Sequence, residues 1–298
     1  MKLARAAALI AALLAAGCER KPAAPAPATA SRPRVVAHSP AVGVIVRDLK
    51  QEELVVGRHG HDMVLDRALP VVGTQEGFDY EALLAARPTH IITQWGSREL
   101  PRRLVELARE RGWEVLDTRL LSLEDIRRDT LAVDEFLCRA RGVPAPSEEG
   151  ARLAAEMDRA WSRRGEGFEK LGRVLLLASV NPPAAFGPGS SHYEVLVRIG
   201  ATPAMTAGSA YIELDAERIV GLAPDVVVLV LPRGLGTDAP AWEERMRGAR
   251  EKLAGLAVPA AERGRLGIVD EPLALLPSTS MIAFADELAE VLEAFSRE

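Results

Sequence analysis

The sequence predicts an α/β fold with two lobes, each built on a sheet rich in parallel strands, joined by one long helix and enclosing a ligand cleft. Three observations support this. Short β-branched runs alternate with helical patterns, which indicates βαβ units. One helical segment separates two such stretches. An acidic motif occurs in both, because Glu81 precedes Pro88 by seven residues, as Glu217 precedes Pro224.

The first 17 residues are typical of a targeting segment. Lys2 and Arg5 precede the apolar run Ala6–Ala16, whose 11 residues are too few to span a bilayer as a helix. Small residues then lead to Cys18, which fits a bacterial lipobox, although Ala15 stands where a leucine is usual. The alternative is an ordinary secretory signal with a chance cysteine. We expect lipid on Cys18 to anchor the protein to a membrane surface.

Residues 18–33 are rich in Ala and Pro and predict an extended tether. Loss of residues 1–17 removes two positive charges, so the formal charge changes from −5 to −7. There is no basic stripe, and nucleic acid is therefore not expected as a partner. Cys138, the only other cysteine, lies in a helical pattern and is expected to be a small core residue.

The first lobe is expected over residues 34–143. Leucines at helical spacing predict a helix over Ser97–Arg111 that ends at Gly112. Four short runs, each bounded by turn or helix signals, are the expected strands. They are Arg34–Ala37, Leu54–Gly57, His90–Thr93 and Glu114–Asp117.

A helix is expected over Leu123–Arg141, and Ser147 followed by two acids predicts the start of the next one. This next helix is the expected link, within residues 144–171. One helical crossing favours a stiff spine and limited closure. The second lobe, residues 172–298, repeats the pattern. Its expected strands are Arg173–Ser179, Asp225–Leu231 and Arg265–Val269, with helices over Tyr193–Ile199 and Phe284–Phe295.

Four segments together resemble one protein family. They are Arg34–Pro40 with Leu54–Gly57, Val71–Gly73 with Asp79–Pro88, Val180–Pro183 with Gly187–Gly189, and Leu214–Asp225. In this order, and after a lipoprotein leader, they resemble the periplasmic binding proteins for cobalamin, haem and ferric siderophores, which serve ABC importers. The resemblance covers almost all of residues 34–298. It implies two Rossmann-like lobes joined by one long helix, with the ligand between them.

The resemblance also assigns a role to the two acidic motifs. In that family a glutamate on the outer surface of each lobe pairs with arginines of the two membrane subunits, and Glu81 and Glu217 occupy those places. Exposed ion pairs are worth only about 0–1 kcal/mol each, so they would orient docking rather than supply all the affinity. The alternative interpretation is that both are favourable acids at helix N-termini.

Loops that follow the strands are the expected ligand contacts. A broad, flat, largely apolar ligand needs aromatic faces and few charges, and the resemblance puts aromatic contacts near Trp95, Phe186 and Tyr211. The alternatives are that Trp95 packs on its own lobe and that Phe186 belongs to the core. The full set of expected contacts is Ser39, Pro40, His59, His61, Gln75, Trp95, Phe186, His192 and Tyr211.

The histidines do not define a metal site. Imidazole is a common metal ligand, but His59 and His61 lie in a loop without the further ligands of a zinc hydrolase. A solvated histidine, or one bonding a ligand carboxylate, is the favoured interpretation, and a haem axial role stays open. The family often has a tyrosine-bearing stretch where residues 59–62 stand. The ligand therefore stays open among corrinoid, haem and ferric siderophore, although Asn181–Pro183 resembles the cobalamin branch.

These observations predict a lipid-anchored, extracytoplasmic solute-binding protein that captures a chelated metal and delivers it to an ABC importer permease. We expect a monomer in the periplasm or at the cell surface, with no resident cofactor and no enzymatic activity. The alternative is a secreted metal-dependent hydrolase or chelatase-like enzyme, with Ser190–His192 as the candidate nucleophile region, although Gly-x-Ser-x-Gly is absent. A third possibility is a sensor or surface adhesin built on the same lobes.

Overall fold

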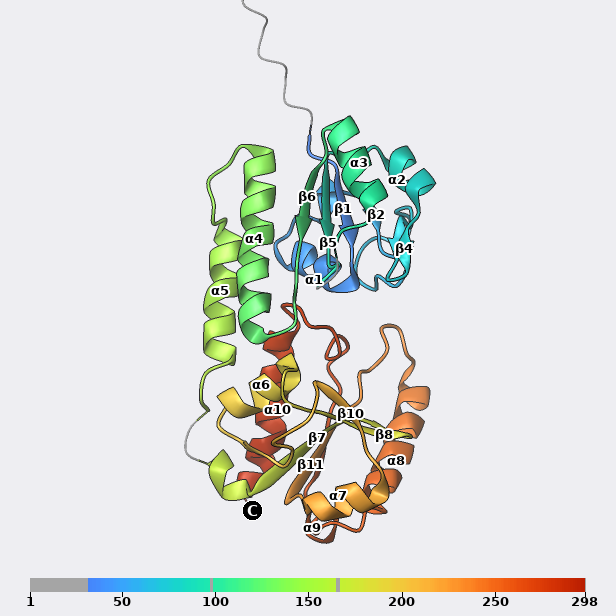
Figure 1. Ribbon diagram of the computed structural model, residues 1–298. Helices are drawn as coiled ribbons and strands as arrows, with labels where there is room; N and C mark the ends of the chain where they lie inside the picture. Colours follow the sequence, from blue (N-terminus) through green and yellow to red (C-terminus); the bar gives the residue numbers. More distant parts are fainter. Residues whose placement is uncertain (1–31, 97–98, 165–166, 298) are drawn as a thin grey trace, which may run out of the picture. The chain divides into compact units, whose positions relative to one another are not determined.

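The computed structural model describes residues 32–96, 99–164 and 167–297 (Figure 1). The targeting segment, Cys18 and nearly all of the tether lie outside the described residues. Residues 33–298 form one compact unit. Within the described ranges, no helix has the length and apolar character needed to cross a membrane.

The first lobe is built on a four-stranded sheet with the order β2-β1-β5-β6, in which every pairing is parallel. Its strands are β1 (Val35–His38), β2 (Val55–Arg58), β5 (His90–Thr93) and β6 (Glu114–Asp117). The predicted bounds of β5 and β6 are confirmed, and β1 and β2 lie one residue later than predicted. The parallel pairings place all four strand ends, with the loops that follow them, along one edge of the sheet.

Three helices and a small hairpin complete this lobe. They are α1 (Pro40–Asp48), α2 (Tyr80–Ala86) and α3 (Arg102–Arg111), with β3 (Gly73–Thr74) paired to β4 (Gly77–Phe78). The short 3₁₀ helix η1 (Glu52–Leu54) precedes β2. Ser97, the predicted start of α3, lies outside the described residues, and residues 99–101 are not helical. The helix begins behind Pro101, because a proline disfavours helical backbone in the residue before it.

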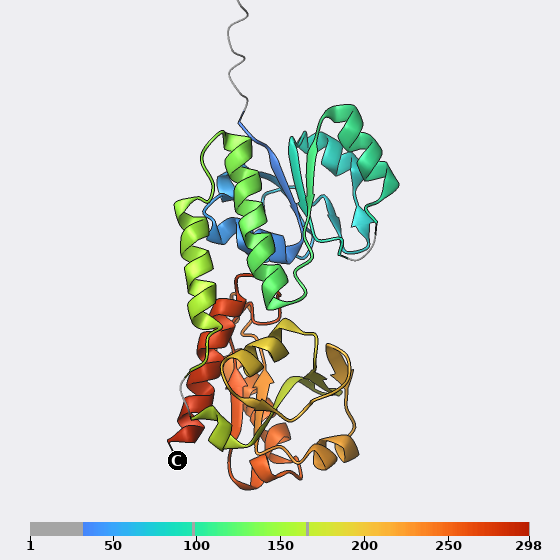
Figure 2. The same cartoon turned by 60° about the vertical axis from the view of Figure 1, so that its left-hand side comes forward.

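Two antiparallel helices connect the lobes and lie side by side in Figures 1 and 2. The first, α4 (Leu123–Arg141), has its predicted bounds and starts at a capping box formed by Ser122 and Asp125. The second, α5 (Glu148–Ala160), is capped by Ser147 as predicted. It is shorter than the link of residues 144–171 that the sequence suggested. The chain leaves the helix at Trp161, whose buried ring donates from Nε1 to the Met281 carbonyl at 3.1 Å.

The 3₁₀ helix η2 (Phe168–Leu171) leads into the second lobe. Its six-stranded sheet has the order β10-β8-β7-β11-β12, with β9 beside β7. Strands β7, β9, β11 and β12 are parallel, β8 pairs antiparallel with β7, and β10 pairs antiparallel with β8. The strands are β7 (Arg173–Val180), β8 (Pro183–Phe186), β9 (Thr202–Pro203), β10 (Tyr211–Glu213), β11 (Val226–Val230) and β12 (Leu266–Val269).

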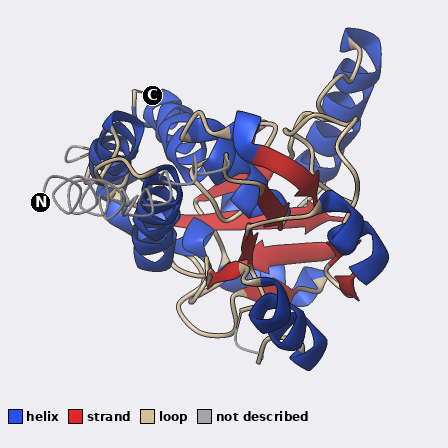
Figure 3. Cartoon of the chain, turned by 90° about the horizontal axis from the view of Figure 1, so that it is seen from above, coloured by secondary structure: helices blue, strands red, loops and turns tan. Residues whose placement is uncertain are grey.

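The described part of the second lobe contains five helices. In the view from above, helices flank the strands on both sides (Figure 3). The five helices are α6 (Ser191–Arg198), α7 (Ala216–Leu222), α8 (Ala239–Ala254), α9 (Pro259–Glu262) and α10 (Met281–Ser296). The predicted strands and helices of this lobe are confirmed within three residues at each end. The fold class predicted from the sequence, two α/β lobes with parallel-rich sheets, is therefore confirmed.

One apolar core passes through both lobes. It contains Ile45 of α1, Phe136 of α4, Met157 of α5 and Phe284 of α10, all buried. Cys138 of α4 is also buried, as predicted. Hydrogen bonds add to the join, because Glu194 Oε2 accepts from the Leu123 amide at 2.7 Å and Thr279 Oγ1 donates to Asp48 Oδ2 at 2.5 Å.

Candidate functional site

The two acidic motifs fold alike. Asp79 caps α2 by accepting from the Ala82 amide at 3.0 Å, and Asp215 caps α7 by accepting from the Arg218 amide at 2.7 Å. Glu81 and Glu217 therefore stand in the first turns of their helices, and both are exposed. Helix α2 lies on the first lobe and α7 on the second, well apart in two views (Figures 1 and 2).

Both helices also end alike. Arg87 (φ 46°, ψ 57°) and Ala223 (φ 41°, ψ 59°) adopt the left-handed conformation, and a proline follows each. This conformation costs a residue with a Cβ about 1–2 kcal/mol. Its occurrence at both ends indicates that the surrounding structure holds each helix in a defined position.

The ends of β1, β2 and β5 meet at a hollow of about 150 Å³, which we call the imidazole hollow. Six of the nine predicted ligand contacts line it. Its full lining is His38, Ser39, Pro40, His59, His61, Gln75, Gln94 and Trp95. These six residues come from four separate loops. His38 and Gln94 also line the hollow; they stand in two of the loops that the sequence indicated, but they were not among the nine expected contacts.

Ser39 and Gln94 build one wall of this hollow. Ser39 Oγ accepts from the Ala41 amide at 3.1 Å and so caps α1, while it donates to Gln94 Oε1 at 2.7 Å. Ser39 is therefore engaged in holding the wall. Gln94 directly follows β5, in one of the strand-end loops where ligand contacts were expected.

His38 is a packed residue rather than a free imidazole. Its ring stacks on Phe78 with centroids 3.7 Å apart, and Nδ1 lies 3.5 Å from Thr93 Oγ1. Burial, assisted by the neighbouring His59, lowers the pKa of His38 to about 4. The ring is therefore neutral at physiological pH. The sequence places it at the end of β1, and the pairing of β1 with β5 brings it close to Trp95, which follows β5. Phe78 comes from the separate β3–β4 hairpin.

The two loop histidines present different nitrogens. His59 Nδ1 accepts from the His61 amide at 3.1 Å, so its Nε2 carries the proton in the neutral ring. Burial lowers the pKa of His59 as well. In exposed His61, Nδ1 donates to the amide oxygen of Gln75 at 3.0 Å. This bond leaves the lone pair of His61 Nε2 available, and no described residue hydrogen-bonds to that atom.

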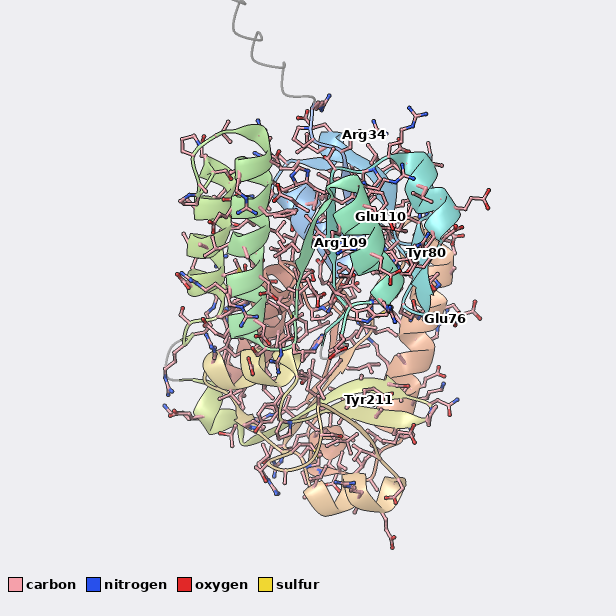
Figure 4. All side chains as sticks on the ribbon, turned by 45° about the horizontal axis from the view of Figure 1, so that its top comes forward. Arg34, Glu76, Tyr80, Arg109, Glu110 and Tyr211 are labelled. Carbon is pink, nitrogen blue, oxygen red and sulfur yellow. The ribbon has the colours of Figure 1, made fainter. Side chains whose placement is uncertain are left out.

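A second hollow, of about 230 Å³, is mostly apolar, and we call it the apolar hollow. Tyr211 of β10, labelled in Figure 4, is 53% exposed there, beside Leu121 at 48% and Leu275 at 46%. The full lining is Leu120, Leu121, Phe186, Gly189, Ser190, Ser191, His192, Ala210, Tyr211, Leu275 and Pro277. Among the described residues, no Lys, Arg, Asp or Glu lines either hollow.

Two predicted ligand contacts, Phe186 and His192, are buried residues that line the apolar hollow. Phe186 is only 9% exposed and stacks on His192 with centroids 3.9 Å apart, which supports the core alternative for Phe186. His192 Nε2 donates to the Ala274 carbonyl at 2.6 Å, and burial lowers the pKa of His192 to about 4. Phe186 and Phe284 thus pack against this imidazole and its Nε2 is engaged, so Tyr211 is the aromatic side chain of this hollow that stays accessible.

A third hollow, of about 260 Å³, shares Leu275 with the apolar one. Two cations of α8, Arg245 and Lys252, line it together with Asn181. Arg245 donates to the Pro232 carbonyl at 3.2 Å. Neither cation forms an ion pair with a described residue. Positive charge is thus available beside the apolar surface.

No family model matches the chain, and no curated protein matches it in sequence. Solved structures do match. The periplasmic heme-binding protein HutB of Vibrio cholerae has a TM-score of 0.66 at 18% identity, covering 89% of this chain and 99% of its own. The vitamin B12-binding protein BtuF of Vibrio cholerae and the heme-binding protein RhuT of Roseiflexus sp. RS-1 both score 0.61, at 16% and 20% identity, with the same coverage.

The chain has the fold of these binding proteins. The match runs over nearly their entire length and over 89% of this chain. These neighbours are named as binding proteins rather than as enzymes. At such identities the likeness establishes the fold, and the ligand must be argued from the residues of this chain.

Proposed function

We propose that the protein is an extracytoplasmic solute-binding protein of an ABC importer, and that its cargo is a metal tetrapyrrole or a related metal chelate. One observation carries the proposal. An accessible imidazole and an accessible apolar surface lie at loops that follow strand ends, in a fold shared with heme- and vitamin B12-binding proteins. Cys18 would tether the protein to a membrane by its lipid, in the periplasm or at the cell surface.

The apolar hollow suits the face of a macrocycle. Large apolar side chains gathered at an exposed site usually mark a binding surface, and Tyr211, Leu121 and Leu275 are all about half exposed. A flat ring placed on them would bury apolar area on both partners. Acid groups at the rim of such a ring would face Arg245 and Lys252 in the adjoining hollow.

The imidazole hollow suits the metal of a chelate. His61 Nε2 can occupy one coordination position, while Gln75 holds the other ring nitrogen in the way that metal-bound histidines are usually supported. A single imidazole supplies a single ligand. The cargo must therefore bring the remaining ligands itself, as a tetrapyrrole does.

Delivery would use the two docking glutamates, Glu81 and Glu217. Both are exposed, and they stand on different lobes in equivalent first turns. Two acids held apart on a stiff frame can meet two positive pockets and fix the register of docking. The core that joins the lobes supplies this stiffness.

No observation favours the hydrolase alternative. Ser190 Oγ caps α6 by accepting from the Tyr193 amide at 3.1 Å, and it donates to the Gly187 carbonyl at 3.0 Å. His192, its neighbour in sequence, is held by the Ala274 carbonyl. In the described part of the chain, no three acidic, histidine or cysteine side chains form a metal-binding group.

The absorption spectrum of the protein purified from its own cells tests the cargo. Corrins, haems and ferric siderophores absorb differently in the visible range, so the bound compound reports its own class. We expect a coloured complex with one ligand for each chain. A colourless protein that binds none of the three would refute the proposal.

Stimulation of the importer's ATPase tests delivery. The double variant Glu81→Ala/Glu217→Ala should lose stimulation while its ligand affinity stays unchanged. The matched control is Glu110→Ala/Glu244→Ala, which removes two exposed acids from α3 and α8 (Figure 4 labels Glu110). Equal stimulation by both double variants would exclude the docking role.

A further inference from the structure

We infer that Arg34 and Arg173 are positioning residues that set the direction of the two docking glutamates. This inference rests on the docking role proposed for Glu81 and Glu217. Each arginine stands at the start of the first strand of its lobe and reaches across to the end of the helix that carries the glutamate. We call each such set of contacts an arginine latch.

The latch of the first lobe holds the last turn of α2. Arg34 Nε donates to the carbonyl of left-handed Arg87 at 2.9 Å, and Nη2 donates to the Ala86 carbonyl at 2.7 Å. The backbone is tied at the same place. The Arg34 amide donates to Thr89 Oγ1 at 2.9 Å, and the Thr89 amide donates back to the Arg34 carbonyl at 2.9 Å.

The latch of the second lobe repeats this arrangement at α7. Arg173 Nη2 donates to the carbonyl of left-handed Ala223 at 3.0 Å. The Arg173 amide donates to Asp225 Oδ2 at 2.9 Å, and the Asp225 amide donates to the Arg173 carbonyl at 2.8 Å. Arg263 pairs with the same carboxylate at 2.7 Å and supports it.

The corresponding residues match position by position. Thr89 and Asp225 each directly follow the proline of their motif. The arginines, by contrast, lie 47 residues before Glu81 and 44 residues before Glu217. Each arginine lies outside its motif, at a different distance along the chain, yet each donates to the carbonyl of the left-handed residue that ends its helix. The two lobes therefore share the contact although the spacing in sequence differs.

The contact matters for direction because each helix is short. Helices α2 and α7 have seven residues each, about two turns, and such helices are marginal alone. An aspartate fixes the first turn and the guanidinium fixes the last carbonyls, which otherwise lack partners. Held at both ends, the helix cannot roll on the sheet, so the glutamate keeps one direction toward the importer.

Amide hydrogen exchange tests whether the latch holds the helix. Arg34→Met should speed exchange of the α2 amides about tenfold and leave α7 unchanged. Arg173→Met should do the reverse, so each variant is the control of the other. Arg34→Lys and Arg173→Lys, which keep one charged donor, should exchange at intermediate rates. Unchanged exchange in both Met variants would overturn the latch.

Double-mutant cycles test whether the latch acts through its glutamate. Arg34→Met should raise about threefold or more the protein concentration that half-maximally stimulates the importer's ATPase, with unchanged ligand affinity. In a Glu81→Ala background the same change should have no further effect, whereas in a Glu217→Ala background it should keep its full effect. A purely structural role would give the same fold-change in both backgrounds and would refute the inference.

The two levels of the proposal fail in different ways. If Glu81→Ala and Glu217→Ala leave stimulation intact, the docking role is wrong and the positioning role ends with it, whatever the exchange rates are. If the glutamates matter but the arginine effects are additive, docking stands and the positioning role is wrong.

Discussion

The amide oxygen of Gln75 accepts a hydrogen bond from His61 Nδ1 at 3.0 Å, and this contact leaves Nε2 as the ring nitrogen that no described residue hydrogen-bonds. It fixes the tautomer with the lone pair on Nε2. The ring also meets His59 edge to face, with centroids 5.5 Å apart. An exposed histidine is thereby given one orientation before any cargo arrives.

His61→Ala should lower the affinity for iron protoporphyrin IX about tenfold or more, because one metal ligand is lost. Metal-free protoporphyrin IX should bind wild type and variant equally, since it has no coordination position to fill. Gln75→Leu should give a smaller loss. Absorbance titration measures all three, and an equal loss with both porphyrins would contradict metal ligation.

Tyr211→Ala should weaken cargo binding by about 1–2 kcal/mol, because an accessible aromatic face is removed from the apolar hollow. The fold should be little affected, since the side chain is 53% exposed. Val197→Ala, at another exposed apolar position on α6, is the control and should change neither property. Calorimetric titration and thermal melting separate the two effects, and unchanged binding by Tyr211→Ala would count against the proposed contact.

Acid should destabilise the protein through His192. Burial lowers the pKa of His192 from its usual 6.5 to about 4 in the folded chain. The neutral ring is thus favoured by folding. The stabilisation that this gives the folded state is complete above pH 6.5 and is lost as the pH falls toward 4. At pH 5 the loss of folding free energy is about 2 kcal/mol.

Urea unfolding at pH 7 and pH 5 measures this loss. In His192→Gln, whose amide can still donate to the Ala274 carbonyl, the loss between the two pH values should be smaller by about 2 kcal/mol. The pKa of His38 is lowered as well, but His38 is present in wild type and in His192→Gln, so it contributes the same loss of stability to both. An identical loss in wild type and variant would exclude His192 as a source.

Gly43→Ala should destabilise the fold by about 1–3 kcal/mol. A Cβ at this position would lie 1.9 Å from Asp62 Oδ2. That carboxylate cannot turn aside freely, because Oδ1 accepts from the Val64 and Leu65 amides. The turn after His61 would shift, and cargo binding should weaken as well.

Gly248→Ala is the matched control. It lies within α8 with open space around it, and alanine should stabilise this helix by about 0.5–1 kcal/mol. Denaturant midpoints compare the two variants. An unchanged denaturant midpoint for Gly43→Ala would show that the turn at Asp62 can move aside without loss of stability.

Most helix and strand bounds could be predicted from the sequence because the residues that start and end them are neighbours in the chain. Ser147 and the acids after it started α5, and Gly112 ended α3. The end of α5 was missed since it depends on Trp161 reaching Met281, a residue 120 positions away. No periodicity in the helix itself contains that information.

The candidate site was predicted in part for the same reason. Strand ends are visible in the sequence, and so Trp95, His61 and Gln75 were found. Which side chains then become packed depends on tertiary neighbours. Phe186 and His192 stack on one another, and His38 lies on Phe78, only because separate segments meet.

Ile45, Phe136, Met157 and Phe284 belong to one continuous apolar core, which contains buried residues of both lobes. Neither lobe can separate from the other without exposing part of this core. We therefore expect a single cooperative melting transition, and severed halves that aggregate when expressed apart. A compound that binds the folded protein at any site would therefore raise the melting temperature of the whole chain. Thermal-shift screening of coloured and colourless compounds alike would then detect cargo wherever it binds.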